Sequence, residues 1–295
     1  MYKSRNSPIQ AGEPFSPAET ERLVDRLHTD GFCHLGSVLE PDEVGALREA
    51  MERKIEDPTM AEDRPGDHRR GRSLMRMFEY DIAFRDLIAR EPFVSLAETI
   101  LGENCHCMSQ NALFTPPDPE AAADGPGGWH VDDLLHFPLP QDGRHDPRIA
   151  LPVFVIQLFV PLTDIEAVEF GPTQVVPGSH RAGRNPGKQD RPEFAGGGPV
   201  SMLARTGEAY LFNNQIWHRG APNVSSRQRL LGGVTYSKRF VAQRFYPFVD
   251  YRMPDHVWEG AGPRLQRGQA PGSGGWESGG GGATHPPTAN RTTYA

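Results

Sequence analysis

Apolar residues recur at helical spacing in the first third of the chain. In the first such stretch Leu23, Val24 and Leu27 share one helical face, which predicts an amphipathic helix packed on a core. Ser, Pro and Glu before it suit a helix start, and a glycine after it suits a helix end. The elements predicted in this part are a helix from Ser16 to Gly31, a strand over Phe32–Leu39, a helix that Pro41 begins and a helix over Phe93–Leu101.

Beyond about residue 104 the pattern changes to short runs of β-branched and aromatic residues, separated by Gly and Pro clusters, which is typical of strands. Helices first and strands afterwards argue against alternating βαβ units. The order favours a mainly β fold, with helices packed outside an antiparallel sandwich or barrel. The predicted strands are His106–Thr115, Val153–Leu162, Gln174–Val176, Ala209–Asn213 and Leu230–Tyr236.

Composition supports many short elements joined by turns. Of the 295 residues, 32 are glycine and 28 are proline, about a fifth of the chain, against about 12% in average proteins. Part of this excess lies in residues 263–295, where little can be buried. We therefore predict a Gly/Pro-rich flexible tail there.

Charge and cysteine content narrow the class of protein. The net charge of −7 argues against general affinity for nucleic acid or anionic membranes. The longest apolar run, Ile149 to Val160, is far shorter than the ~20 residues of a membrane helix. The first eleven residues contain no apolar core of the kind that a secretory signal has. Three cysteines, Cys33, Cys105 and Cys107, suit a reducing compartment, so we predict a cytoplasmic protein.

The strongest local candidate for chemistry is the segment Trp129-His130-Val131-Asp132. On a strand, residues i and i+2 point to the same face, so His130 and Asp132 would present an imidazole and a carboxylate together. A second histidine, His218, follows a predicted strand 88 residues later. Two histidines and one carboxylate form the facial triad of non-haem Fe(II) oxygenases, which leaves three coordination positions open.

Neither half of this pattern is decisive alone. Another H-x-D triplet, His28 to Asp30, lies in the first predicted helix, where residues i and i+2 diverge by about 200°. Because such triplets occur without a metal, the simpler interpretation is that His130 and Asp132 are ordinary surface residues. After His218 the chain carries Arg227 and Arg229, and a buried arginine there would hold a carboxylate through a bidentate pair. On a strand both arginines would point to the same face, so the spacing does not show which of them would bind the carboxylate.

Other clusters have simpler interpretations. The triplet Cys105-His106-Cys107 has no second pair of ligands in the sequence pattern to complete a tetrahedral metal site. We interpret its thiols as buried and free, because unpaired cysteine is among the most buried residue types.

The segment 169–180 reads EFGPTQVVPGSH. It resembles the N-G-P-x-x-V-x-P-G-S-H signature of the phytanoyl-CoA dioxygenase (PhyH-like) family of Fe(II)/2-oxoglutarate oxygenases, with Phe170 where asparagine is usual. With the preceding H-x-D and the following His and Arg, the resemblance covers roughly residues 20–260. It implies a double-stranded β-helix (jelly-roll, cupin-like) with the N-terminal helices outside. We predict one domain over 1–262, with a helical part of about 16–103 and a jelly-roll of about 104–262.

The resemblance also implies residue roles. The metal ligands would be His130, Asp132 and His218. Arg229 would bind the far carboxylate of 2-oxoglutarate, with Arg227 as the alternative. Thr173 would supply a hydroxyl to the same cosubstrate, and Gln110 would line its pocket. His180 belongs to the signature without being a ligand, and with Ser179 would fix a turn. The intact Asp132 disfavours halogenation, because related halogenases lack this carboxylate.

The implied activity uses Fe(II), 2-oxoglutarate and O2. Such an enzyme decarboxylates 2-oxoglutarate to succinate and CO2 and oxidises, by default hydroxylates, an unactivated C–H bond. We expect a small-molecule substrate, no nucleic-acid partner and no membrane, and the sequence leaves the oligomeric state open. Two alternatives remain: a structural or non-catalytic metal-binding jelly-roll, and a cupin-like metalloenzyme that does not use 2-oxoglutarate.

Overall fold

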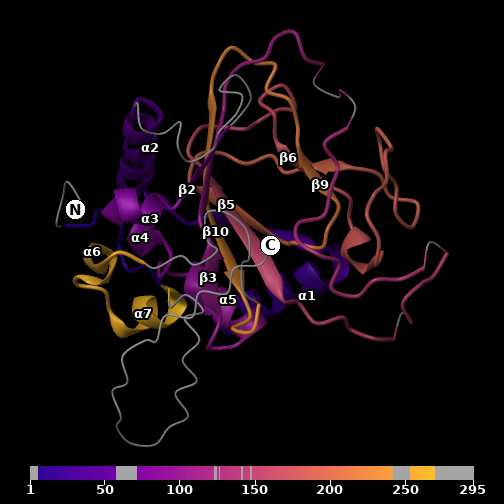
Figure 1. The fold of residues 1–295 in the computed structure, drawn as a ribbon, viewed down its shortest axis with the longest axis horizontal. Helices are drawn as coiled ribbons and strands as arrows, with labels where there is room; N and C mark the ends of the chain where they lie inside the picture. Colours follow the sequence, from indigo (N-terminus) through magenta and orange to yellow (C-terminus); the bar gives the residue numbers. More distant parts are fainter. Residues whose placement is uncertain are drawn as a thin grey trace, which may run out of the picture.

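The chain folds into two antiparallel β-sheets, with helices on the outer face of the larger one (Figure 1). The computed structural model describes residues 6–57, 72–122, 125, 127–140, 142–146, 148–241 and 253–269. The helices are α1 Pro17–Asp30, α2 Pro41–Ile55, α3 Met77–Tyr80, α4 Ile82–Leu87, α5 Phe93–Leu101, α6 Asp255–Trp258, α7 Pro263–Gln269 and the 3-10 turn η2 Ser179–Arg181.

The larger sheet has the strand order β1-β8-β5-β10-β4-β2, with β3 also paired to β10. The smaller sheet has the order β7-β6-β9. The strands are β1 Phe32–Ser37, β2 Arg72–Met75, β3 His106–Ser109, β4 Asn111–Thr115, β5 Val155–Pro161, β6 Thr173–Val175, β7 Val200–Ser201, β8 Glu208–Asn213, β9 His218–Gly220 and β10 Arg229–Ser237. This is the predicted mainly β, jelly-roll architecture, built of two facing sheets without a closed barrel.

Strand β10 shows how the two sides of the large sheet are divided. All nine of its residues are buried, and successive side chains point to opposite faces. Leu230 and Val234 join the core under the helices, whereas Leu231 packs between the two sheets with Val175 of β6 and Phe212 of β8. Burial of every residue therefore shows that β10 is covered on both faces.

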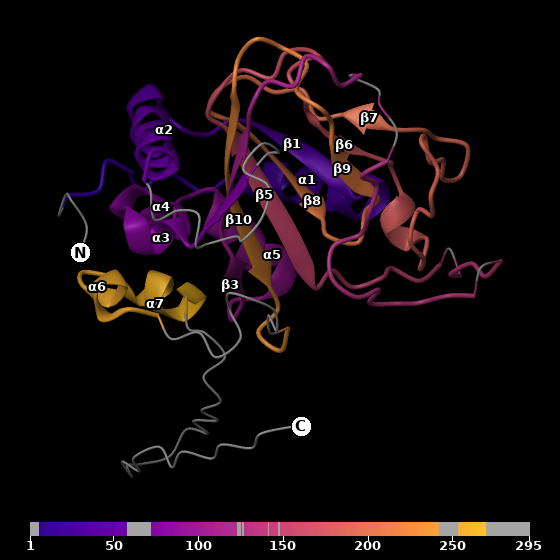
Figure 2. The same ribbon diagram turned by 45° about the horizontal axis from the view of Figure 1, so that its top comes forward.

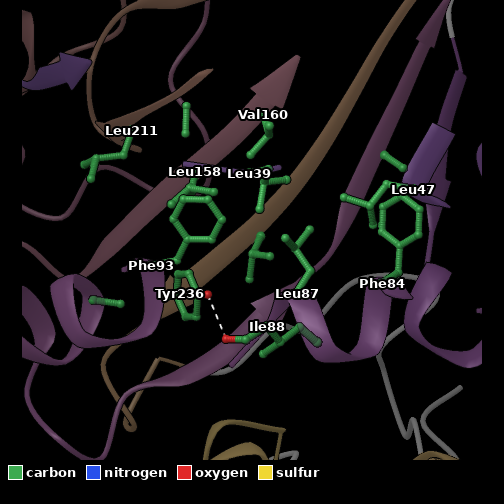
Figure 3. Close-up of a cluster of buried hydrophobic side chains, with 14 of the residues drawn as sticks. Leu39, Leu47, Phe84, Leu87, Ile88, Phe93, Leu158, Val160, Leu211 and Tyr236 are labelled. Atoms are coloured by element: carbon green, nitrogen blue, oxygen red, sulfur yellow. Dashed lines mark hydrogen bonds between the residues drawn. The ribbon is translucent and has the colours of Figure 1, made fainter. Parts of the chain in front are cut away.

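The helices cover the outer face of the large sheet. In both views α2, α3, α4, α6 and α7 lie on one side of β5 and β10, and β6 and β9 lie on the other (Figure 2). In the core beneath them, Phe84 and Leu87 of α4 approach the same sheet face as Leu158 of β5 (Figure 3). Tyr236 of β10 donates a hydrogen bond to the carbonyl of Ile88 at 2.8 Å, which ties this helical layer to the sheet.

Helix α1 begins and ends as the sequence predicts. The Ser16 hydroxyl accepts from the backbone N–H of Glu19 at 3.3 Å, and Gly31 adopts the left-handed conformation with φ of 84°. The Glu19 carboxylate pairs with Arg22. Among the described residues, no helix is long and apolar enough to span a bilayer.

The predicted tail begins too early, because its first seven residues form a helix. Residues 263–269 form α7, whose Leu265 is buried in the core. Arg264 of α7 pairs with Glu91 and with Glu98, so charge as well as apolar contact holds this helix against α5. The rest of the predicted tail lies outside the described residues.

Candidate metal centre

A single backbone bridge brings the two halves of the predicted triad together. His130 and His218 exchange both backbone N–H···O=C hydrogen bonds at 3.0 Å, so His130 lies directly beside the first residue of β9. The N–H of Asp132 donates to the carbonyl of Asn214 at 3.2 Å. His130 and Asp132 lie outside the regular strands, because the segment forms one bridge at His130 and bends from Asp132 onward.

The three side chains converge on one point. Asp132 Oδ1 lies 3.5 Å from His130 Nε2, and Asp132 Oδ2 lies 3.4 Å from His218 Nε2. One ligand atom from each of the three residues lies within 4.8 Å of the others. Three ligands about 2.1 Å from an ion and at right angles to one another would be about 3 Å apart. A small inward movement of the side chains would therefore complete a facial site.

Backbone carbonyls fix the orientation of both imidazoles. His130 Nδ1 donates to the carbonyl of Gly128 at 2.7 Å, and His218 Nδ1 donates to that of Ile216 at 2.9 Å. With the proton on Nδ1, each Nε2 presents its lone pair to the point of convergence, as in metal-binding histidines. The donor set of two imidazoles and one carboxylate thus fits Fe(II).

The charge of the carboxylate is stabilised at this point. Burial acts to raise the pKa of Asp132, but the adjacent His218 and His130 outweigh it and hold the pKa well below its usual range. The adjacent Asp132 carboxylate raises the pKa of His130. The site is open on one side, because the His130 side chain is 50% exposed and that of His218 only 8%.

Amide side chains around the triad hold its backbone and its carboxylate. Gln157 of β5 donates to Asp132 Oδ2. Gln215 donates to the carbonyls of Asp132 and Leu134, both at 3.3 Å, and accepts from the N–H of His136 at 2.8 Å. The segment after Asp132 is therefore anchored to the turn that precedes β9.

The segment 169–180 holds the chain immediately before the second histidine in place. Ser179 Oγ accepts from the backbone N–H of Trp217 at 2.8 Å, immediately before the second histidine. Gly178 has φ of 76°, and its N–H donates to the carbonyl of Asp30 at the end of α1. His180 Nε2 donates to the carbonyl of His28, so it lies away from the triad and fixes the turn.

Arg229 lies between the sheets and Arg227 does not. Arg229 is 6% exposed, and it donates to the carbonyl of Gly171 and to Thr115 Oγ1. No carboxylate pairs with it among the described residues, and its Nε has no hydrogen-bond partner. Desolvation lowers its pKa. Arg227 is exposed and lies over the Phe170 ring at 4.4 Å.

Thr173 of β6 faces the same interior. It is 5% exposed, and its Oγ1 lies 2.9 Å from the hydroxyl of Tyr210 on β8, so the pair shares a hydrogen bond. Tyr210 is close enough to interact electrostatically with Arg229. Burial raises the pKa of Tyr210 to about 12, which keeps its hydroxyl protonated. Tyr210 was not predicted from the sequence, although alternation along β8 puts it on the face of Phe212.

The prediction that Gln110 lines the cosubstrate pocket is wrong. The chain breaks between β3 and β4 at this residue, and Gln110 Nε2 donates to the carbonyl of Phe84 on α4. Ser109 is paired with Thr235 and Leu113 with Leu231, so residue 110 falls on the opposite, helix-covered face.

The cysteines are buried or half-buried and free, as predicted. Burial raises the pKa of Cys33 to about 12 and that of Cys105 to about 11, so these thiols stay protonated. His106, between Cys105 and Cys107, contacts the carbonyl of Val241 at 2.9 Å.

Comparison with known proteins places this geometry in context. The model of the phytanoyl-CoA dioxygenase (PhyH) family matches residues 27–231. Ectoine dioxygenase from Nocardia farcinica is 27% identical over 66% of this chain and 70% of its own length. Ectoine dioxygenase from Streptomyces coelicolor is 26% identical over 60% of this chain and 56% of its own length.

Solved structures share the fold at low identity. SnoN, a non-haem α-ketoglutarate-dependent epimerase from nogalamycin biosynthesis, superposes with a TM-score of 0.58 at 24% identity over 80% of this chain and 90% of its own. HygX from Streptomyces hygroscopicus, with nickel, 2-oxoglutarate and hygromycin B bound, gives a TM-score of 0.57 at 18% identity over 75% and 88%. Both likenesses establish the two-sheet architecture.

Proposed function

The chain belongs to the phytanoyl-CoA dioxygenase (PhyH) family, and from this premise we propose that it is an Fe(II)/2-oxoglutarate-dependent dioxygenase. In this proposal it oxidises, by default hydroxylates, an unactivated C–H bond of a small-molecule metabolite, with decarboxylation of 2-oxoglutarate to succinate and CO2. The observation that carries the proposal is the combination of a His-Asp-His triad with a buried arginine that pairs with no carboxylate in the described part of the chain.

In this proposal His130, Asp132 and His218 hold the iron. Each imidazole offers Nε2 because its Nδ1 is committed to a backbone carbonyl. Asp132 supplies negative charge and is held in place by Gln157. When bound, the iron supplies the activation of O2 and of the 2-keto acid, and three protein ligands leave three of its six positions open.

Arg229 receives the far carboxylate of 2-oxoglutarate. Gly220 is two residues beyond His218 on β9, about 7 Å along the strand. A Cβ on Gly220 would lie 3.8 Å from Arg229 Nη2. The guanidinium therefore lies beside residue 220, and residue 220 is about 7 Å along β9 from His218. An extended five-carbon dicarboxylate bridges such a span. Thr173 and Tyr210 share a hydrogen bond beside the arginine and would donate to the same carboxylate.

Two further aspects belong to the proposal. The substrate is a small molecule, as ectoine is for the relatives of that name. The free, protonated thiols suit a reducing cytoplasm.

The test is O2-dependent turnover of purified protein reconstituted with Fe(II). We expect succinate to form from 2-oxoglutarate, slowly without a primary substrate and faster with one. His218→Ala should abolish both the bound iron and the succinate, whereas His28→Ala, in the helical H-x-D triplet, should change neither. A protein that holds iron tightly and forms no succinate with any substrate of a broad panel would be a structural metal protein instead. Succinate-free oxidation would favour a cupin-like enzyme.

A further inference from the structure

Two large apolar side chains that face solvent, Leu134 and Phe240, lie on segments that adjoin the metal centre and the large sheet. Among the described residues, the three most exposed are Leu134 at 85%, Phe240 at 70% and Ile149 at 55%. Leu134 lies two residues after the metal-site carboxylate, and Phe240 lies three residues after β10. An exposed apolar group of this kind marks a binding surface more often than a single exposed residue does.

Phe154 in this region has the ring of another phenylalanine on either side, and we name Phe137, Phe154 and Phe240 the aromatic shelf. The ring centroids of Phe137 and Phe154 are 5.4 Å apart, and those of Phe154 and Phe240 are 5.2 Å apart. These are the distances of favourable aromatic pairs. Phe137 and Phe154 are half-buried, so part of each ring remains open to solvent.

The aromatic shelf is continuous with the metal centre. The His136 ring lies 5.2 Å from Phe154, and the His136 N–H is bound by Gln215, which also binds the carbonyl of Asp132. Phe154 precedes Gln157, the residue that contacts the Asp132 carboxylate, by three positions, about 10 Å of extended chain. Phe154 of the shelf is therefore linked to the triad through His136 and Gln215, and along the chain through Gln157.

Charge at the shelf favours an uncharged occupant. Burial lowers the pKa of His136, so its imidazole is neutral at pH 7. Arg148 and Asp146, on the loop between Phe137 and Phe154, are paired with each other at 2.5 Å. The three rings of the shelf present aromatic faces and edges, which bind flat rings through apolar burial and offset or edge-on stacking.

We propose that the aromatic shelf binds an uncharged, planar ring of the primary substrate and directs an adjoining C–H bond toward the triad. This rests on the proposed oxygenase function, because it assigns the substrate class of that site. The ring of Phe240 is mostly exposed and contributes little to the folded core, so its open surface can contact a ligand.

The test uses 1-naphthol as the probe and cyclohexanol as its non-planar counterpart, with protein loaded with Mn(II) and 2-oxoglutarate. Paramagnetic relaxation of the probe protons by Mn(II) reports both binding and closeness to the metal. We expect 1-naphthol to be relaxed and to bind more tightly than cyclohexanol. Phe240→Ala should weaken naphthol binding about 3- to 10-fold, the value of one aromatic contact.

The matched control is Leu203→Ala, which removes another exposed apolar side chain, 40% exposed, beyond β7 of the small sheet. It should leave naphthol binding unchanged, and the melting temperature of each variant verifies folding. Phe154→Leu, which keeps apolar bulk but removes the ring, should weaken naphthol binding as Phe240→Ala does.

Naphthol that is not relaxed, or that binds Phe240→Ala and Phe154→Leu as tightly as the wild type, would overturn the proposal. Failure of the oxygenase assignment gives a different result. In that case 2-oxoglutarate would not bind the metal-loaded protein and no succinate would form, whereas naphthol would still be relaxed by Mn(II) and still depend on Phe240.

Discussion

Arg229 allows the sharpest prediction from the structure. A guanidinium has five N–H donors, and Arg229 uses its two Nη groups on the Gly171 carbonyl and the Thr115 hydroxyl. Its Nε has no partner, and no described carboxylate neutralises its charge. The free donors suit a bidentate pair with the far carboxylate of 2-oxoglutarate. Arg229→Gln keeps a polar side chain but removes the charge and the bidentate geometry.

The magnitude follows from the bonds that are lost. A hydrogen bond to a charged group contributes about 1.5–3 kcal/mol, so losing this pair should cost about 3 kcal/mol of binding free energy. At about 1.4 kcal/mol per tenfold, the Kd for 2-oxoglutarate should rise on the order of 100-fold. The assay is calorimetric titration of Co(II)-loaded protein with 2-oxoglutarate.

A second ligand isolates the contact. 2-Oxobutanoate has the keto acid but lacks the far carboxylate, so Arg229→Gln should change its Kd less than about threefold. Arg227→Gln, which alters an exposed arginine over Phe170, should leave both affinities unchanged. An equal loss for the two ligands in Arg229→Gln, or a loss of 2-oxoglutarate affinity in Arg227→Gln, would refute the assignment.

Three other predictions concern the supports of the site. Ser179→Ala removes the acceptor of the Trp217 N–H, and we expect unfolding free energy to fall by about 1–2 kcal/mol in denaturant titrations, with weaker iron binding; unchanged stability would contradict this. Burial lowers the pKa of His180 from 6.5 to about 4, so the unfolded chain takes up a proton first as pH falls. Unfolding free energy should therefore drop by up to about 3 kcal/mol between pH 6.5 and 4, and His180→Asn should flatten that slope; an equally steep slope would count against it. Truncation after Gly262 exposes the pocket of Leu265 and should lower the melting temperature by several degrees in calorimetry, whereas truncation after residue 269 should not.

The sequence predicts the β-rich fold because its strand signals are strong. Alternation and β-branched runs identify β5, β8 and β10 to within two residues of their observed bounds. Short strands such as β9, with three residues, carry no period of their own and form only through pairing with β6. Helix α7 was hidden because its one buried apolar residue, Leu265, lies in a Gly/Pro-rich stretch.

The candidate site is likewise predicted only in part from the sequence. The H-x-D pair and His218 are local signals, and the fold brings them together through one backbone bridge that spacing alone does not predict. Burial separates Arg229 from Arg227, which share strand parity in the sequence. Gln110 was assigned to the pocket on the resemblance alone, and the resemblance does not show that the chain breaks between β3 and β4 at this residue.

The central claim is that three protein ligands hold iron while leaving room for 2-oxoglutarate to chelate it. The most direct measurement is an anaerobic titration of the Fe(II)-loaded protein with 2-oxoglutarate, followed by visible absorption. We expect a new charge-transfer band that saturates at one equivalent and is absent from the His218→Ala protein. Iron bound at one equivalent with no spectral change on addition of 2-oxoglutarate would contradict it.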